Sequence, residues 1–359
     1  MKVLGVVSAR PNFVKMAPVV RALAAQGVDA FLAHTGQHFD AEMSGVFFAE
    51  LGLPAPRVNL GVGALLPWQQ SGRIVEGLGN LIAEEKPDWV IVPGDVNGTL
   101  AAAVAAVRTG TRLAHLESGL RSFDRRMPEE LNRIAVDHLA DRLYVTEPSG
   151  GENLKREGVP DARVCFAGNT MIDTLDACRG RAEKRAPLSS LALDDGYILL
   201  TMHRPDSVDS EPGQRRLLEI VRAASELAAV VFPVHPRTRR RMRELGTEAA
   251  FRESPRVFLI EPLGYLDFMA AMLRARVVMT DSGGIQEETT ALGLACLTLR
   301  ESTERPITCS VGTNRVVGTL PESVRKALRD VWSKPPIGTR PEGWDGRASA
   351  RVVQDLLTA

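Results

Sequence analysis

The chain has 359 residues, 44% hydrophobic and 25% charged, which is ordinary for a globular protein. Its 44 basic and 44 acidic residues cancel, so the composition excludes a global field for nucleic acid or an anionic membrane, and any anion site must be local. Four widely spaced cysteines predict neither a zinc site nor a disulfide framework, and they fit a cytoplasmic protein. The apolar start is too short for a signal peptide, and no run approaches the ~18 residues of a membrane span.

Short apolar runs alternate with helical patterns along the whole chain. Strand-like runs occupy residues 2–7, 29–36, 88–95, 112–118, 142–147 and 163–168, then 197–203, 229–235, 257–262, 277–282 and 295–300. Amphipathic stretches such as 12–27 and 266–276 lie between them. Buried runs of this length that alternate with helices predict α/β domains with parallel sheets covered on both faces.

The alternation falls into two series, which predict two doubly wound, Rossmann-like domains. We expect the first domain at residues 1–169, a helical connector at 170–195 and the second domain at 196–346. An amphipathic terminal helix at about 347–359 is expected to join the first domain. Because ligands of such sheets bind beyond the carboxyl ends of the strands, and polar motifs follow strand after strand here, we expect the active site in the cleft between the domains.

The segment "TDSGGIQEETTALG", residues 280–293, leaves an apolar run and starts a helix after Ser282, Gly283 and Gly284. One interpretation is a well-capped helix whose acidic first turn suits the helix dipole. The other is a phosphate site, because glycines leave the backbone N–H groups at a helix start uncovered. The first predicted strand is followed by "SARPNF", which lacks the G-x-G-x-x-G motif of dinucleotide-binding domains. The sequence therefore gives no support to a reaction that uses bound NAD.

Four blocks occur in a distinctive order: "ARPNFVKMAPVVRAL", "ESGLRS" followed by "MPEELNR", "DSGGIQEETTALG", and "RESTERP". Over about nine-tenths of its length the chain resembles the non-hydrolysing UDP-N-acetylglucosamine 2-epimerases, which have the two-domain GT-B architecture. It departs from the usual family pattern at Asn12, Val96 and Ile307, and in "HRPDS" at residues 203–207.

The resemblance implies reversible interconversion of UDP-GlcNAc and UDP-ManNAc by a cytoplasmic homodimer that needs neither cofactor nor metal. UDP would be eliminated to give a 2-acetamidoglucal and then added back, which requires acid/base groups near C2 and a firm hold on UDP. The alternatives are a 2-epimerase for a modified UDP-sugar, a hydrolysing 2-epimerase that releases ManNAc and UDP, a GT-B glycosyltransferase, and a UDP-sugar-binding protein without turnover.

The resemblance also implies residue roles. By themselves, Asp95 is a common type of turn residue, Lys15 a common solvated helix residue and Glu129 a good helix-start residue. Arg133 lies four residues after Glu129, on the same helix face, where it could hold that carboxylate ionised. The family implies catalytic roles for Asp95, Glu117, Glu129 and His203, a possible allosteric site at Gln37 and His38, and substrate contacts from Arg10, Lys15, Arg133, His235, Ser282, Gly283, Gly284, Glu288 and Arg305.

Overall fold

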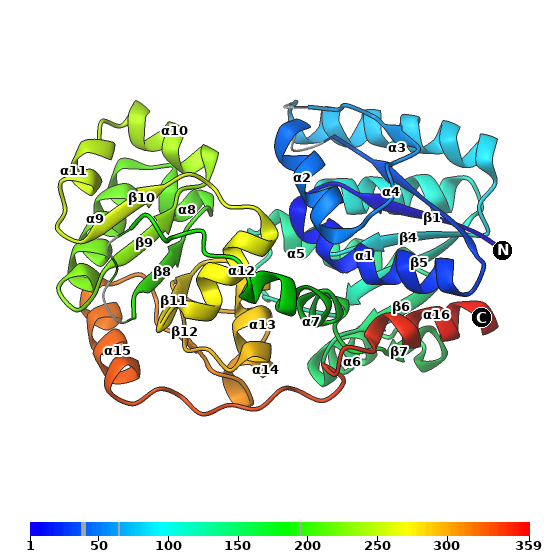
Figure 1. The fold of residues 1–359 in the computed structure, drawn as a ribbon. Helices are drawn as coiled ribbons and strands as arrows, with labels where there is room; N and C mark the ends of the chain where they lie inside the picture. Colours follow the sequence, from blue (N-terminus) through cyan, green and yellow to red (C-terminus); the bar gives the residue numbers. More distant parts are fainter. Residues whose placement is uncertain (37–40, 64, 192, 194–195) are drawn as a thin grey trace. The chain divides into compact units, whose positions relative to one another are not determined.

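The protein is described here by a computed structural model that covers residues 1–36, 41–63, 65–191, 193 and 196–359. The chain divides into two compact units (Figure 1). Unit 1 contains Met1–Ala177 and Glu342–Ala359, and unit 2 contains Cys178–Pro341. Gln37 and His38, the expected allosteric residues, lie outside the described residues.

The described residues of unit 1 form a seven-stranded parallel sheet in the order β3-β2-β1-β4-β5-β6-β7. The strands are β1 (Lys2–Val7), β2 (Asp29–His34), β3 (Val58–Asn59), β4 (Trp89–Pro93), β5 (Arg112–Ser118), β6 (Arg142–Val145) and β7 (Val164–Phe166). The helices are α1 (Arg10–Ala25), α2 (Ala41–Leu51), α3 (Pro67–Glu85), α4 (Asn97–Arg108), α5 (Pro128–Leu139), α6 (Pro148–Arg156) and α16 (Ala348–Thr358), with a short 3-10 turn at Asp161–Arg163. Helix α7 (Thr170–Glu183) begins in unit 1 and ends in unit 2.

The described residues of unit 2 form a six-stranded parallel sheet in the order β10-β9-β8-β11-β12-β13. Its strands are β8 (Ile198–Thr201), β9 (Val230–Pro233), β10 (Val257–Ile260), β11 (Val277–Thr280), β12 (Cys296–Thr298) and β13 (Asn314–Val316). Its helices are α8 (Pro205–Val208), α9 (Glu211–Ser225), α10 (Pro236–Glu244), α11 (Glu248–Arg252), α12 (Tyr265–Arg274), α13 (Gly283–Leu292), α14 (Ile307–Ser310) and α15 (Pro321–Ser333).

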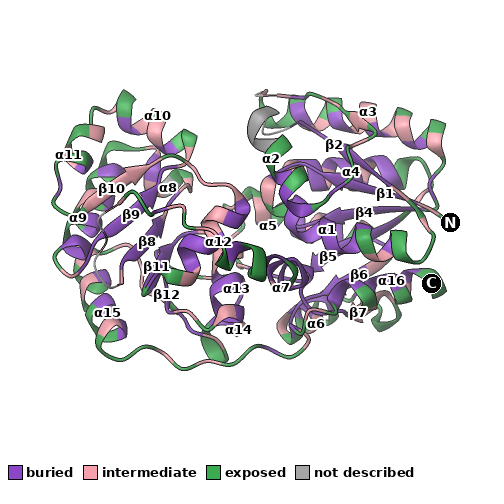
Figure 2. Ribbon diagram, viewed as in Figure 1, coloured by how far each residue is buried: buried purple, intermediate pink, exposed green. Residues whose placement is uncertain are grey.

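Both sheets confirm the predicted α/β, doubly wound class. Numbered within each unit, the first six strands follow the same order, 3-2-1-4-5-6. The order reverses between β1 and β4 in unit 1 and between β8 and β11 in unit 2, and ligands of such folds bind at these switch points. The central strands are buried along their whole length, except for the exposed Arg112 at the start of β5 (Figure 2), as expected for sheets with helices on both faces.

The last helix, α16, packs in unit 1, where Asp173 of α7 caps its start. The Asp173 carboxylate accepts hydrogen bonds from the backbone N–H groups of Ala348 (3.1 Å) and Ser349 (2.7 Å) and from the Ser349 hydroxyl (2.6 Å). Just before the helix, the buried Trp344 indole donates to the Thr146 carbonyl at 2.9 Å. These bonds attach the last residues of the chain to the first unit.

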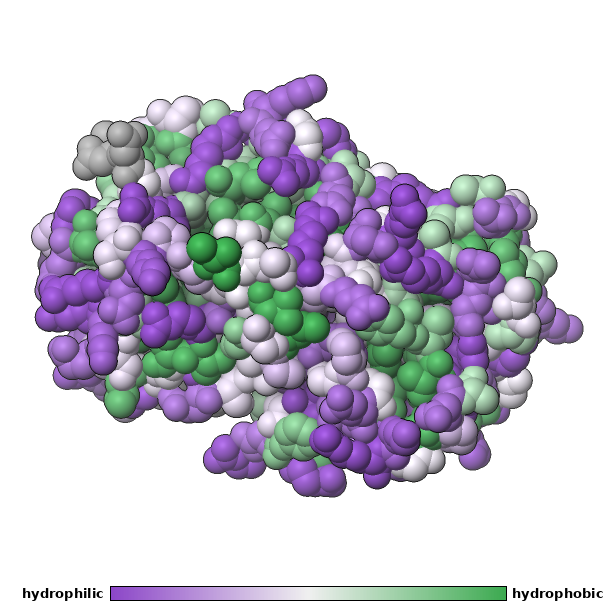
Figure 3. Space-filling view, turned by 90° about the horizontal axis from the view of Figure 1, so that it is seen from below, coloured by the Kyte–Doolittle hydropathy of each residue, from purple (hydrophilic) through white to green (hydrophobic). Residues whose placement is uncertain are grey.

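Hydrophilic side chains are interspersed with smaller apolar patches on the face shown in Figure 3. In the part of the chain that the structure describes, we find no helix that is both long and apolar enough to span a membrane.

Candidate active site

At the switch point of unit 1, two acid–base pairs come together beyond β1, β4 and β5. Lys15 of α1 forms an ion pair with Glu117 of β5, and both side chains are buried. Asp95 follows β4 and forms an ion pair with Arg133 of α5. Gly94 lies between the pairs: a Cβ built on it would be 3.2 Å from Lys15 Nζ and 3.6 Å from Glu117 Oε2. Four expected site residues are therefore neighbours, and Lys15 is not the solvated helix residue of the simpler interpretation.

Glu117 has a backbone conformation that only a few residues adopt. Its φ is +69°, in the left-handed region, and Gly119 two residues later has φ +78°. A non-glycine residue held there costs about 1–3 kcal/mol, and such strain concentrates at functional sites. The turn also gives close packing, since a Cβ on Gly119 would meet the Gly150 carbonyl oxygen at 2.3 Å.

The expected pairing of Arg133 with Glu129 is wrong. Among the described residues, the carboxylate partners of Arg133 are Asp95 and Glu130, with Arg133 Nη2 2.7 Å from Glu130 Oε2. Glu130 is buried and also accepts from the backbone N–H groups of Ser122 (2.8 Å) and Phe123 (2.9 Å). Burial alone would raise the pKa of Glu130, but these donors and Arg133 lower it. Glu129 is half-exposed on the same helix, where it is open to a ligand.

Two residues of α1 support this edge. Arg10 lies with its guanidinium carbon 5.3 Å from the Phe47 ring centroid. Asn12, one of the departures from the family pattern, is buried: its side-chain oxygen accepts from the N–H groups of Ser8 (3.1 Å) and Ala9 (3.0 Å), and its amide donates to the Pro93 carbonyl (3.0 Å). Asn12 thus joins the first turn to the end of β4 and uses both halves of its amide.

At the switch point of unit 2, His203 follows β8 and Asp281 follows β11. The His203 ring nitrogen Nδ1 lies 2.9 Å from Asp281 Oδ1, while Asp281 Oδ2 accepts from the backbone N–H groups of His203 (2.9 Å) and Arg204 (2.8 Å). Burial alone would lower the pKa of His203, but the charge of Asp281 and the bond to it raise that pKa. Burial alone would raise the pKa of Asp281, which His203 and the backbone donors lower instead. Asp281 therefore orients a half-exposed imidazole that can carry a proton.

His235 lies close to this pair. It caps the start of α10, where its Nδ1 accepts from the N–H of Arg237 at 3.3 Å, and its ring centroid is 6.0 Å from that of His203. The two expected histidines are thus neighbours at the ends of adjacent strands.

Helix α13 begins at Gly283, with Ser282 as its N-cap residue. Among the described residues of its first turn none is acidic, and the Ser282 side chain makes no capping bond. The expectation of an acidic first turn is therefore wrong, because Glu287 and Glu288 lie further into the helix. Uncapped N–H groups at a helix start suit an anion such as a phosphate, so the capping interpretation loses its support.

Glu288 is buried in α13 and accepts a hydrogen bond from the Tyr265 hydroxyl at 3.0 Å. Burial raises the pKa of Glu288 to about 7, against the smaller lowering by Tyr265. The carboxyl group can therefore change its charge near neutral pH. Tyr265 begins α12 and could not be identified from the sequence.

Arg305 is only 7% exposed and lies among carboxylates. Its Nε is 3.1 Å from Glu287 Oε1 and its Nη1 is 3.3 Å from Glu304 Oε2. A Cβ on Gly283 would come within 2.4 Å of Arg305 Nη1, so the guanidinium packs directly against the start of α13. The structure thus gives Arg305 a position under the expected phosphate site.

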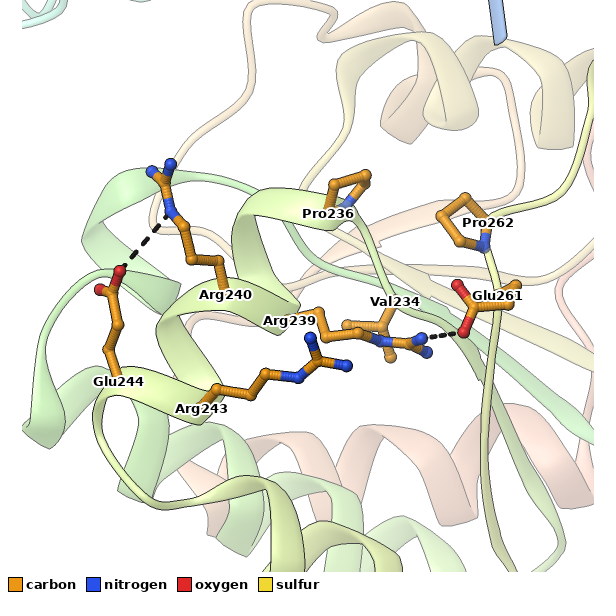
Figure 4. Close-up of a pocket in the computed structure, with 8 residues that line it drawn as sticks. All are labelled: Val234, Pro236, Arg239, Arg240, Arg243, Glu244, Glu261 and Pro262. Carbon is orange, nitrogen blue, oxygen red and sulfur yellow. Dashed lines mark hydrogen bonds and ion pairs between the residues drawn. The ribbon is translucent and has the colours of Figure 1, made fainter. Parts of the chain in front are cut away.

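A pocket of about 410 Å³ lies beside α10 (Figure 4). Arg239 reaches across it to Glu261 and Arg240 pairs with Glu244, so its arginines are largely neutralised. Its lining consists of Val234, Pro236, Arg239, Arg240, Arg243, Glu244, Glu261 and Pro262. None of these is an expected site residue. Within the described residues, no group of three or more His, Cys, Asp or Glu side chains could hold a metal ion.

The family model for UDP-N-acetylglucosamine 2-epimerase matches residues 21–357, almost the whole chain. The chain belongs to this family. The epimerase family membership confirms the resemblance drawn from the four sequence blocks, and the two parallel sheets agree with it.

Individual relatives of this epimerase chain match over its full length. A UDP-N-acetylglucosamine 2-epimerase from Methanocaldococcus jannaschii is 37% identical, with 99% of each chain covered. A UDP-2,3-diacetamido-2,3-dideoxy-D-glucuronate 2-epimerase from Pseudomonas aeruginosa is 38% identical, again with 99% of each chain covered. The crystal structure of the M. jannaschii UDP-GlcNAc 2-epimerase in complex with UDP-GlcNAc and UDP has a TM-score of 0.93 at 37% identity and covers 100% of both chains.

Proposed function

We propose that this chain is a non-hydrolysing UDP-N-acetylglucosamine 2-epimerase, an isomerase that reversibly interconverts UDP-GlcNAc and UDP-ManNAc. The observation that carries the proposal is its likeness, over the full length, to a relative whose structure is in complex with UDP-GlcNAc and UDP. The chemistry of the two switch points supports it: unit 1 supplies carboxylates paired with bases, and unit 2 supplies an anion-binding helix start and a histidine.

In the proposed reaction, unit 2 makes most of the contacts to UDP, and Arg10 of unit 1 adds one. The N–H groups at Ser282, Gly283 and Gly284 would bind the diphosphate, and Glu288 would accept hydrogen bonds from the ribose hydroxyls. Arg10 and His235 would add contacts to the nucleotide. Arg305 would act from beneath the diphosphate, since its guanidinium packs against Gly283.

Acid/base groups would then act on the sugar. A base removes the proton on C2, the electron pair forms the C1–C2 double bond, and UDP leaves C1 with the bonding electrons. Re-addition of UDP at C1, with a proton delivered to the other face of C2, gives the epimer. We assign these transfers to Asp95, Glu117, Glu129 and His203 as a set, with Lys15 and Arg133 holding the first two carboxylates.

The test is proton NMR of the purified protein with UDP-GlcNAc in D2O. We expect UDP-ManNAc with deuterium at C2, together with C2 exchange in the UDP-GlcNAc that remains. Free ManNAc and UDP accumulating as end products would identify a hydrolysing enzyme instead. An unchanged substrate in the presence of bound UDP would contradict the proposal.

A modified substrate is the second candidate. The Pseudomonas aeruginosa relative, named for a diacetamido-glucuronate sugar, is as similar as the UDP-GlcNAc relatives. Competition between equal amounts of UDP-GlcNAc and the UDP-diacetamido-glucuronate measures the ratio of the two kcat/KM values directly.

We also propose that the protein is a homodimer. Light scattering, which measures the molar mass in solution, tests this proposal.

A further inference from the structure

One histidine of unit 1 lies beneath the acid/base groups and is not among the residues proposed above. His115 is in the middle of β5, two residues before Glu117, and its side chain is fully buried. A buried imidazole is costly unless its polar atoms have partners. His115 has a partner at each ring nitrogen.

The Nε2 atom lies 2.8 Å from the Gly94 carbonyl oxygen, and Nδ1 lies 2.7 Å from Asp137 Oδ1. A carbonyl oxygen only accepts, so Nε2 carries a proton. Asp137 is also surrounded by donors: its Oδ2 accepts from the Gly119 N–H at 3.0 Å and lies 2.8 Å from Arg121 Nη1. Burial alone would raise the pKa of Asp137, but His115 and Arg121 lower it. An ionised Asp137 accepts from Nδ1 as well, so both ring nitrogens donate.

These two bonds join the two catalytic turns. Gly94 immediately precedes Asp95, has φ +69° and donates its own N–H to the Leu116 carbonyl at 3.1 Å. Asp137 of α5 holds the N–H of Gly119, at the end of the turn that carries Glu117. His115 therefore connects the turn of one carboxylate to the helix that holds the turn of the other.

The buried charges around this histidine are balanced. The Arg121 guanidinium, 1% exposed, contacts Asp137 on one side and makes two bonds of 2.7 Å with Glu157 on the other. His115 and Arg121 thus face the carboxylates of Asp137 and Glu157, of which Asp137 is fully buried and Glu157 is partly exposed. Such a satisfied network is rigid, because loss of one member leaves a buried charge uncompensated.

We propose that His115 is a positioning residue for the acid/base chemistry, which fixes the Asp95 and Glu117 turns relative to each other by donating from both ring nitrogens, to the Gly94 carbonyl and to Asp137. The role of His115 in turnover rests on the proposed function, whereas the donation of hydrogen bonds from both of its ring nitrogens does not.

The first test is His115→Gln, which can replace one of the two bonds but not both. Because small displacements of reacting groups cost up to about 100-fold in rate, we expect kcat to fall about 30- to 100-fold. The affinity for UDP, measured by calorimetry, should stay within about twofold, since none of the proposed UDP contacts comes from the Asp95 or Glu117 turns. The matched control is His138→Gln, an exposed histidine of α5 whose ring bonds only to the Ile134 carbonyl among the described residues. A kcat within threefold of wild type, or a parallel loss of UDP affinity, would overturn the proposal.

The second test uses the wild-type protein and needs neither turnover nor a folded variant. With 15N-labelled histidine, long-range 1H–15N spectra at about pH 7.5 should show one buried ring that carries protons on both nitrogens. That signal should persist in His203→Gln, which removes the other carboxylate-paired histidine, and should exchange slowly with solvent. A singly protonated His115 ring would refute the double donation even if the enzyme epimerises. A doubly protonated ring in a protein that lacks epimerase activity would refute the proposed function alone.

Discussion

The two units share one strand order but equip the same topological position differently. At its switch point unit 1 has ion pairs, Lys15 with Glu117 and Asp95 with Arg133, supported by the His115–Asp137 network. Unit 2 has the start of α13, where the N-cap Ser282 makes no side-chain capping bond, and His203 oriented by Asp281. The ion pairs of unit 1 thus present charged side chains, whereas the start of α13 in unit 2 presents backbone N–H groups. This difference predicts that substitutions at the unit 1 ion pairs change rate, and that substitutions at the start of α13 change UDP affinity.

The largest expected effect is that of Glu117→Gln in unit 1. The amide keeps the size of the side chain but cannot exchange a proton, so kcat should fall by about 10³-fold, within the range of general acid/base catalysis. UDP affinity should be unchanged. NMR progress curves and calorimetry measure the two quantities, with Glu84→Gln, an exposed residue of α3, as the matched control. A tenfold weaker UDP complex would contradict the prediction that the unit 1 ion pairs affect the rate without affecting UDP affinity.

The next effect concerns Gly283→Ala in unit 2. The added methyl group would meet the Arg305 guanidinium at 2.4 Å, and such overpacking costs about 1–3 kcal/mol. If UDP binding bears this cost, the UDP complex becomes about 5- to 150-fold weaker. Titration calorimetry gives the dissociation constant. Gly180→Ala is the control, because nothing lies within 4 Å of its Cβ position in α7. Equal affinities of the two variants would show that the start of α13 does not hold UDP.

A pH dependence sharpens the assignment of Glu288. If the ribose hydroxyls donate to its carboxylate, a pKa of about 7 means that the binding form is lost as pH falls below 7. UDP-GlcNAc affinity of the Glu117→Gln variant should be constant above about pH 8 and fall toward tenfold per pH unit below 7. Glu288→Gln should bind weakly at every pH. A dissociation constant that does not change between pH 6 and 8 would contradict this role.

The same pKa predicts the stability of the unliganded protein. The folded state binds the Glu288 proton more tightly than the unfolded chain, whose glutamates titrate near 4.5. The stability that the folded protein gains from protonating Glu288 is therefore fully present at low pH, and it is lost as pH rises from about 4.5 through 7. Glu288→Gln should be more stable than wild type above pH 7, where the buried wild-type carboxylate is charged. This difference in stability should become smaller at pH 5. Thermal melts of both proteins at the two values decide this, and identical pH profiles would exclude a raised pKa.

The smallest effect is expected for Asp173→Asn, at the start of α16, a helix without a counterpart in unit 2. Loss of the charged acceptor for three donors should cost about 1 kcal/mol, or a Tm shift of about 2–4 °C. The kcat at 25 °C should not change. Asp29→Asn, an exposed position of β2, controls for the loss of charge. A changed kcat without a changed Tm would assign α16 a part in turnover.

Most of the fold was predictable because buried parallel strands leave continuous apolar runs. Each of the eleven predicted runs contains a strand of the structure. The strands β3 and β13 were not predicted, since β3 has two residues and β13 reads Asn314-Arg315-Val316. Asn314 is nevertheless buried, because its side chain bonds to Thr298 and Gln286, which are distant in sequence.

Sequence motifs predicted the candidate site residues, but they did not predict the partners of those residues. Motifs located Asp95, Glu117, His203 and the start of α13, because these follow strands. The partners Asp281, Asp137 and Tyr265 depend on strand order and helix packing, which no local pattern encodes. Arg133 is an example. Its spacing along the helix favoured an ion pair with Glu129, whereas in the folded structure it pairs with Asp95, which follows a different strand.

The attachment of α16 to unit 1 has a consequence for how the protein is made. Residues 342–359 emerge from the ribosome only after all of unit 2, although Asp173 and Thr146, which hold them, are synthesised in the first half of the chain. Unit 2 is therefore an insertion within unit 1 and can complete its fold first, while the N-terminal sheet waits for its final helix. Translation that stops within unit 2 would leave the first unit incomplete and exposed to proteolysis.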